Sequence, residues 1–262
     1  MGETGPVTRL IVATFNIRNG RGPDGRNIWW LRRSNTWRVI QSLEADVLAL
    51  QEVRPGQLRW LRRRLASAFE VIAVSRDGGR RGEHLVLAVR RHVGEVTAHE
   101  CRWFTDTPDR PGRHPDARFR RCLLSATVVV GERSVTVANT HLDEQSSTAR
   151  PDAVRRMVGW LHGDAIVVGD FNCTIDDPAV APLFAAGFRD ALMSLPPSGS
   201  GVATHHAFTG RVDGTRIDHV LVHGLPVVTS ARIVHENPPG PWASDHWPVR
   251  VEIQLGASGD AG

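Results

Sequence analysis

The chain contains no lysine and no tyrosine, so arginine supplies all of its basic side-chain charge. The sequence isoelectric point of about 10.0 follows more simply from this use of arginine than from a nucleic-acid role, because the formal net charge is only +4. The absence of lysine also excludes a Walker-type phosphate loop in the glycine-rich stretch from Gly20 to Asn27. Arginine is nevertheless the better side chain for bidentate contact with a phosphate.

Cysteines and long apolar runs are also scarce. The three cysteines, Cys101, Cys122 and Cys173, have no metal-binding spacing and leave one unpaired, which is typical of reduced thiols. No apolar run approaches the roughly 18 residues that span a bilayer, and residues 1–8 have no apolar signal core. We therefore expect a cytoplasmic protein without a membrane partner, and a monomer.

Apolar segments of strand length make up much of the 262-residue chain. The strands that we predict are 10–15, 46–50, 69–74, 85–89, 95–100, 123–130, 134–138, 164–170, 216–222, 227–234 and a last one ending at 255. Helical spacing is predicted for 29–43, 55–65 and 147–162, and in part for 182–192. Irregular segments are predicted at 102–121 and 195–209. Since neither a repeat nor a linker is evident, we interpret 1–262 as a single α/β domain with a core of about 9–255.

Acid, amide and imidazole side chains recur where these apolar strands stop. Asp170 and Asn172 directly follow the apolar run from Ala165 to Val168, and they point to one side if the chain stays extended. An ordinary Asx turn is the alternative for this pair. The complete set comes from six separate segments: Asn16, Glu52, His141, Asp170, Asn172, Asp218, Asp245 and His246.

If the six segments are neighbours, their polar side chains meet at one edge of the sheets. Asn16, Glu52, Asp170 and Asp245 could then hold one or two divalent ions. Their ligand atoms are all oxygen, which favours Mg²⁺ or Mn²⁺ over Zn²⁺. The two histidines leave a zinc hydrolase as the weaker alternative.

Six stretches in order resemble the endonuclease/exonuclease/phosphatase superfamily: FNIRNG, LQEVR, NTHLD, GDFN, RIDHVLV and SDHWPV. Together they extend from Phe15 to Val249, so the resemblance covers nearly the whole chain. It implies a four-layer α/β fold, a two-sheet β-sandwich flanked by helices. It also implies hydrolysis of a phosphodiester or a phosphomonoester by metal-activated water.

The resemblance assigns metal-site roles to the acidic residues. Glu52 matches the family's metal-ligand glutamate, and Asp245 resembles a metal-site aspartate. Asn16 matches the asparagine that supports the metal or the phosphate. Asp170 resembles the residue that orients and deprotonates the attacking water.

Further roles concern the phosphate. Asn172 resembles a donor to the phosphate or the transition state, and His141 a phosphate-binding or acid histidine. His246 resembles the histidine that contacts the scissile phosphate, with Asp218 holding its tautomer. An arginine before the strand at 123–130 often binds phosphate in relatives; we choose Arg120, with Arg121 as the close second.

The chain departs from several nuclease branches of this family, which carry a catalytic tyrosine in the middle of the sequence. We therefore expect a Mg²⁺/Mn²⁺-dependent phosphodiesterase, acting on nucleic acid or a small phosphodiester, that is not a close apurinic-site endonuclease. The alternatives are a phosphomonoesterase on a small phosphorylated metabolite and a non-catalytic phosphate-binding module.

Overall fold

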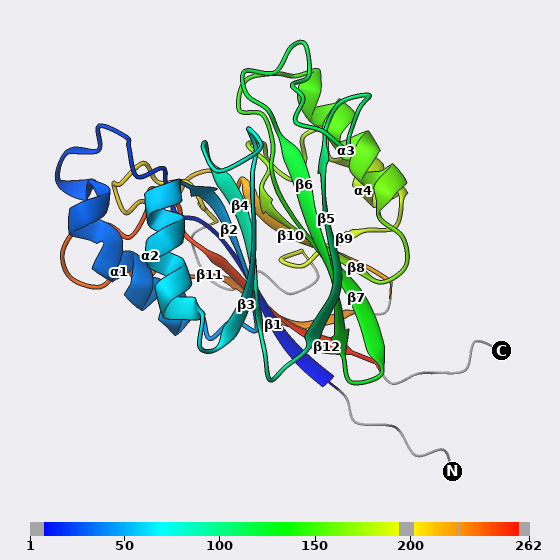
Figure 1. Ribbon diagram of the computed structural model, residues 1–262, viewed down its shortest axis with the longest axis horizontal. Coiled ribbons are helices and arrows are strands. Elements are labelled where there is room, and N and C mark those ends of the chain that lie inside the picture. Colours follow the sequence, from blue (N-terminus) through cyan, green and yellow to red (C-terminus); the bar gives the residue numbers. More distant parts are fainter. Residues whose placement is uncertain (1–7, 194–201, 225, 257–262) are drawn as a thin grey trace.

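Two mixed six-stranded sheets pack face to face between two layers of helices, as the computed structural model of residues 8–193, 202–224 and 226–256 shows (Figure 1). The predicted two-sheet, four-layer sandwich is thus confirmed. Helices α1 (Trp29–Ser42) and α2 (Pro55–Leu65) cover one sheet. Helices α3 (Ala149–Trp160) and α4 (Ala181–Ala185) cover the other. No helix among the residues described is long and apolar enough to cross a membrane.

The first sheet has the strand order β11-β12-β1-β2-β4-β3. In chain order its strands are β1 (Thr8–Asn16), β2 (Val47–Val53), β3 (Phe69–Ser75), β4 (His84–Arg90), β11 (Val227–Ile233) and β12 (Val249–Leu255). The second sheet has the order β5-β6-β7-β8-β10-β9. Its strands are β5 (Glu95–Trp103), β6 (Cys122–Val130), β7 (Arg133–His141), β8 (Ala165–Asp170), β9 (Arg189–Asp190) and β10 (Asp218–His223).

Three apolar clusters fill the spaces between the four layers. The central cluster lies between the sheets and includes Leu10, Leu87, Leu124 and Val168. The second packs α1 and α2 on the first sheet, and the third packs α3 and α4 on the second sheet. Strands buried on both faces read as continuous apolar runs rather than as alternating ones. This burial explains why the run before Asp170 is entirely apolar.

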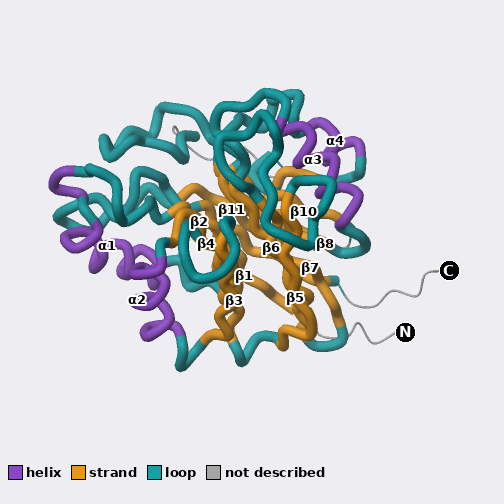
Figure 2. Tube along the Cα trace, turned by 45° about the horizontal axis from the view of Figure 1, so that its top comes forward, coloured by secondary structure: helices purple, strands orange, loops and turns teal. Residues whose placement is uncertain are grey.

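Strand register brings the polar strand ends to one edge of the molecule. β1 and β2 are parallel with Asn16 opposite Gln51, and β7 and β8 are parallel with His141 opposite Asp170. β10 runs antiparallel to β8 and begins with Asp218 opposite Asp170. Loops rather than helices gather over this edge (Figure 2).

A register shift between β2 and β4 turns Glu52 out of the regular ladder. The shift falls between Leu50 and Val53, and Glu52 adopts a left-handed backbone with φ 62°. A bulge of this kind re-aims a side chain at the end of a strand. Asn139, from β7 in the other sheet, donates its amide hydrogens to the carbonyl oxygens of Leu50 (3.1 Å) and Val86 (2.9 Å). The bulge is therefore braced by an amide from the facing sheet.

Two predicted segments differ in detail from the structure. Asp218 and His219 lie within β10, which begins at Asp218 and not at Arg216. The 182–192 segment contains the one-turn helix α4 and the two-residue strand β9. Part of the predicted 195–209 loop lies outside the described residues, and the single-domain interpretation stays a prediction.

Candidate active site

Asp170 lies at the centre of the polar edge, since side chains from three other segments of the chain surround its carboxylate. Its Oδ2 accepts a hydrogen bond from Asn16 Nδ2 at 2.9 Å and lies 3.5 Å from His141 Nε2. His246 Nε2 lies 3.9 Å from the same oxygen. The sequence-predicted residues Asn16, His141, Asp170 and His246 therefore lie together.

The Asp170 carboxyl holds a proton far more tightly than an ordinary aspartate. Burial raises its pKa, the nearby Asp218 carboxylate raises it further, and the result is about 7. His246, Asn16 and the backbone amide of Asn172 act in the opposite direction. A carboxyl whose pKa lies near neutrality suits general-base work at ordinary pH.

His246 and Asp218 form a buried imidazole–carboxylate pair. His246 Nδ1 lies 2.8 Å from Asp218 Oδ2, which orients the ring and leaves Nε2 toward Asp170. Burial lowers the pKa of His246, but the charge and hydrogen bond of Asp218 outweigh it and raise the pKa to about 10. Without a bound ion the ring is therefore an imidazolium cation at neutral pH, directed at the centre of the site.

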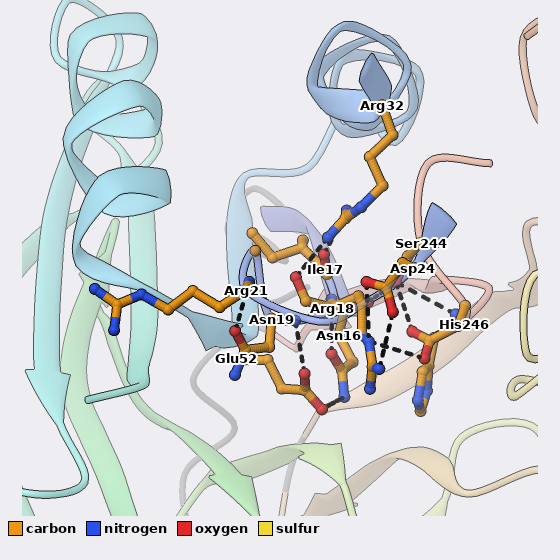
Figure 3. Close-up of polar contacts among 12 residues, drawn as sticks. Asn16, Ile17, Arg18, Asn19, Arg21, Asp24, Arg32, Glu52, Ser244 and His246 are labelled. Carbon is orange, nitrogen blue, oxygen red and sulfur yellow. Dashed lines mark hydrogen bonds and ion pairs between the residues drawn. The ribbon is translucent and has the colours of Figure 1, made fainter. Parts of the chain in front are cut away.

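Glu52 is held by two donors, one from the last residue of β1 and one from the loop that follows it. Its Oε2 accepts the backbone N–H of Asn19 at 2.7 Å, and its Oε1 accepts Asn16 Nδ2 at 3.2 Å (Figure 3). Asn16 Oδ1 in turn accepts the backbone N–H of Arg18 at 3.0 Å. Asn16 thus presents its N–H₂ group to Glu52 and Asp170 and positions both carboxylates.

Asp245 lies at the same edge, on the segment before β12. Burial raises the pKa of Asp245, but His246 and Arg18 outweigh it and leave the pKa below its usual value. Burial also raises the pKa of Glu52, and the carboxylates Glu83 and Asp245 raise it further. Carboxylates that repel one another in a buried site favour a cation between them.

Arg121 and not Arg120 faces this site. Arg121 is buried and lines a pocket together with Glu52 and His141. Arg120 is exposed and lies 3.5 Å from Asp77. Neighbouring residues in an extended segment point to opposite sides, and the sequence alone did not indicate which side faced inward.

The His141 imidazole is neutral. Burial, with the nearby guanidinium groups of Arg121 and Arg76, holds the pKa of His141 well below its usual value. His141 is therefore placed to donate a hydrogen bond, and it has no proton to spare for a leaving group.

Asn172 occupies a tight turn after β8. Its backbone is left-handed (φ 51°), its N–H donates to Asp170 Oδ1 at 2.9 Å, and its side-chain amide donates to Leu142 O at 3.0 Å. The Asx turn that was the alternative is thus present, and it fixes the Asp170 carboxylate. Glycine is required at position 169, directly before Asp170, because a Cβ there would lie 2.0 Å from the carbonyl oxygen of Thr140.

Arg32 is a buried residue of this region that the sequence did not single out. Its guanidinium reaches from α1 and donates to the carbonyl oxygens of Ile17 (2.8 Å), Arg18 (2.7 Å) and Ala243 (2.9 Å) (Figure 3). It ties the segment after Asn16 to the segment before Asp245. Arg32 lies within an arginine-rich helix. Arginines in such a helix are usually expected on its solvent-exposed face, so the sequence did not indicate that Arg32 is buried.

This sandwich, with carboxylates, a carboxylate-held imidazole and a buried guanidinium at one edge, defines a class of phosphoester-hydrolysing enzymes. The chain belongs to the Endonuclease/Exonuclease/phosphatase family, whose sequence profile matches residues 13–246. Members of this family are phosphoester hydrolases, and the chain is accordingly an enzyme of that kind.

Several solved structures share the fold over almost their whole length. A family member from Bacteroides vulgatus is 28% identical with a TM-score of 0.87, covering 95% of this chain and 99% of its own. A mannosyl-6-phosphatase of Bacteroides thetaiotaomicron is 24% identical with a TM-score of 0.85, covering 93% and 99%. TDP2 of D. rerio, in complex with a single-strand DNA product, is 18% identical with a TM-score of 0.74, covering 94% and 98%. Among curated proteins no sequence matches the chain.

Proposed function

We propose that this protein is a Mg²⁺- or Mn²⁺-dependent hydrolase that cleaves a phosphoester of a small molecule by attack of water. The proposal rests on the three nitrogen atoms that surround Asp170 Oδ2. These are Asn16 Nδ2 at 2.9 Å, His141 Nε2 at 3.5 Å and His246 Nε2 at 3.9 Å. A buried carboxylate of raised pKa, flanked by a cationic imidazole, is the pairing that water attack on a phosphate needs.

Glu52 and Asp245 are the residues that would hold the divalent ion, with Asn16 positioning Glu52. Their donor atoms are carboxylate oxygens, and the raised pKa of Glu52 reflects like charges that a cation would relieve. When bound, Mg²⁺ or Mn²⁺ would neutralise charge on the phosphoryl oxygens and make a water easier to deprotonate.

Asp170 accepts the proton of the attacking water. Its two oxygens are fixed by donors from both sheets, so the carboxylate is oriented before substrate arrives. His246, Asn172 and Arg121 then stabilise the negative charge that develops on the phosphoryl oxygens. Neutral His141 supplies a further N–H. Neutral His141 has no proton to give, so the leaving oxygen takes its proton from water or from the His246 imidazolium.

The substrate beyond the phosphate lies in an adjoining pocket of about 260 Å³. This pocket shares Glu52, Arg121 and His141 with the site. Its lining includes two guanidinium–carboxylate pairs, Arg76–Glu83 (2.6 Å) and Arg118–Glu144 (2.7 Å), and both guanidinium groups lie over the Phe119 ring.

The paired charges of this pocket offer hydrogen-bond donors and acceptors without a large net charge. The volume of the pocket is below the roughly 300–1,000 Å³ of pockets that bind drug-sized ligands. The pocket therefore favours a phosphomonoester whose alcohol is a single small polar group. The mannosyl-6-phosphatase among the structural neighbours supports this reading.

A nucleic-acid phosphodiester, which the sequence analysis placed first and the phosphomonoester second, is the second candidate here. The TDP2 structure with a single-strand DNA product shows that this fold accommodates such a substrate. Location in the cytoplasm and a monomeric state stay predictions. A non-catalytic phosphate-binding module is not proposed, since Glu52, Asp170, Asp245 and His246 are all present at one edge.

The experiment that separates the candidates compares rates on p-nitrophenyl phosphate, bis-p-nitrophenyl phosphate and plasmid DNA, each with Mg²⁺, with Mn²⁺ and with EDTA. We expect metal-dependent release from the monoester and little cutting of DNA. Faster cleavage of the diester and nicking of the plasmid would instead establish the second candidate. Rates that are unaffected by EDTA would contradict both.

A further inference from the structure

His205 stands beside the Asp245–His246 pair and belongs to none of the roles described above. It lies opposite His246 in an isolated antiparallel bridge, and their ring centroids are 4.8 Å apart. One ligand atom from each of His205, Asp245 and His246 lies within 4.8 Å of the others. Two imidazole nitrogens and a carboxylate oxygen thus converge from two segments of the chain.

The three side chains differ in how firmly their positions are held. His246 Nδ1 contacts Asp218 at 2.8 Å, the carboxylate–histidine arrangement that orients a metal-binding ring and leaves Nε2 for the metal. Asp245 Oδ1 lies 3.2 Å from the Ser244 hydroxyl, whose single proton is shared with the carbonyl oxygen of Asn16 at 2.6 Å. His205 is exposed, so its ring is free to turn.

The chemistry of this donor set differs from that of the proposed magnesium site. Mg²⁺ is a hard ion that takes oxygen ligands, whereas imidazole nitrogens suit zinc, copper and nickel. A set of two histidines and one carboxylate with an open position is typical of zinc. His205 therefore changes the kind of ion that this side of the site prefers.

We propose that His205, Asp245 and His246 form a second cation site, selective for a late first-row transition ion such as Zn²⁺, whose occupation inhibits hydrolysis. Inhibition follows because His246 and Asp245 would be shared between the ion and the catalytic set. This inhibitory consequence rests on the proposed function, whereas binding of the ion does not.

Two features of the surroundings bear on the site. Zinc bonds of about 2.0–2.2 Å bring ligand atoms closer together than the structure has them, and the exposed His205 ring can close that gap by rotation. The Arg18 guanidinium lies 3.6 Å from Asp245 Oδ2, but it is also paired to Asp24 at 3.0 Å, which offsets its charge. Neither feature prevents a cation from entering, and the entering ion displaces the Nε2 proton of His246 to solvent.

Binding is tested by titrating the EDTA-treated, dialysed protein with Co²⁺ and following the visible absorption bands of the ion, with Zn²⁺ competition for the zinc affinity. Replacement H205F should raise the dissociation constants for Co²⁺ and Zn²⁺ by about tenfold or more, because one of three protein ligands is lost. H99F, at an exposed position on β5, is the matched control and should leave them unchanged.

Inhibition is tested by adding Zn²⁺ to the Mg²⁺-supported reaction on whichever test ester is turned over. The Zn²⁺ concentration for half-inhibition should rise in H205F by the same factor as the dissociation constant, with the rate in Mg²⁺ alone unchanged. Equal affinities in H205F and the parent protein would overturn the site. Stimulation by Zn²⁺ would overturn its inhibitory role, and a protein without turnover would still give the cobalt result.

Discussion

At the scale of single residues, the account depends on Asp170 as the group that accepts the proton of water. We expect D170N to lower turnover by about 10² to 10⁴-fold, because an amide of the same shape cannot act as a base. Circular dichroism and the urea midpoint should stay close to those of the parent protein. Turnover within a few-fold of the parent rate would remove Asp170 from this role.

The adjacent arginines provide a matched pair of variants. R121M should lower kcat/KM by on the order of tenfold to a hundredfold, the effect of losing a hydrogen bond to a charged oxygen. R120M should leave kcat/KM nearly unchanged, because the exposed Arg120 guanidinium forms an ion pair with Asp77 outside the site. Steady-state kinetics on the same ester check both variants. A larger loss in R120M would mean that Arg120 turns inward when substrate binds.

His219 links the stability of the fold to pH. It is buried in β10, where Nε2 lies 2.9 Å from the carbonyl oxygen of Cys173, and burial lowers its pKa to about 4. The unfolded chain, with a histidine pKa of about 6.5, binds more protons between these values. Stability is therefore complete above about pH 6.5 and is lost as the pH falls toward 4.

The contribution of His219 to this loss should be about 2 to 3 kcal/mol at pH 4.5. Urea unfolding of the parent protein and H219Q at pH 7 and pH 4.5 measures it. The variant should lose less stability on acidification than the parent, while H99Q, at an exposed position, should follow the parent. Equal losses in the parent and H219Q would show that His219 is not held neutral.

At the scale of elements, an amide bridge between the sheets supports the bulge that carries Glu52. Asn139 donates to two carbonyl oxygens of the first sheet and accepts a hydrogen bond from Gln51 Nε2 at 2.7 Å. Gln51 Nε2 also donates to Thr14 Oγ1 at 3.0 Å. The bulge is thus held by polar groups in an otherwise apolar interior.

We expect N139A to lower the free energy of unfolding by about 2 to 4 kcal/mol, because it leaves buried carbonyl and amide groups unpaired. Chemical denaturation measures the change, and S134A, at an exposed position of the same strand β7, serves as the control. Since the bulge aims Glu52, the Mg²⁺ concentration for half-maximal activity should also rise in N139A. A change below about 1 kcal/mol would show that water replaces the amide.

The elements differ in how far the sequence could predict them. Apolar runs predicted the strands of both sheets except the two-residue β9, because buried strands show their composition directly whereas β9 contains no apolar run. The bulge at Glu52 was not predicted, because it depends on Asn139 from the other sheet. The burial of Arg32 was not predicted for a related reason. Its hydrogen-bond partners are three backbone carbonyl groups, and every residue has a carbonyl group, so the sequence does not reveal them.

At the scale of the whole molecule, the two parallel strand pairs place the ends of four strands, and the start of β10, at one edge. Polar residues at strand ends therefore predicted which side chains would gather there. Sequence alone could not choose between Arg120 and Arg121, because that choice depends on which face of an extended segment meets the pocket. Nor could it show the pocket beside Phe119, which is built from segments far apart in the chain.

The central claim is that the carboxylates at this edge use Mg²⁺ or Mn²⁺ to hydrolyse a phosphoester. The most direct measurement is the rate on p-nitrophenyl phosphate after EDTA treatment and then after addition of Mg²⁺, for the parent protein and for E52Q. The account predicts no rate in EDTA, recovery with Mg²⁺ in the parent, and a much higher Mg²⁺ requirement in E52Q. A rate that survives EDTA, or returns only with Zn²⁺, would contradict it.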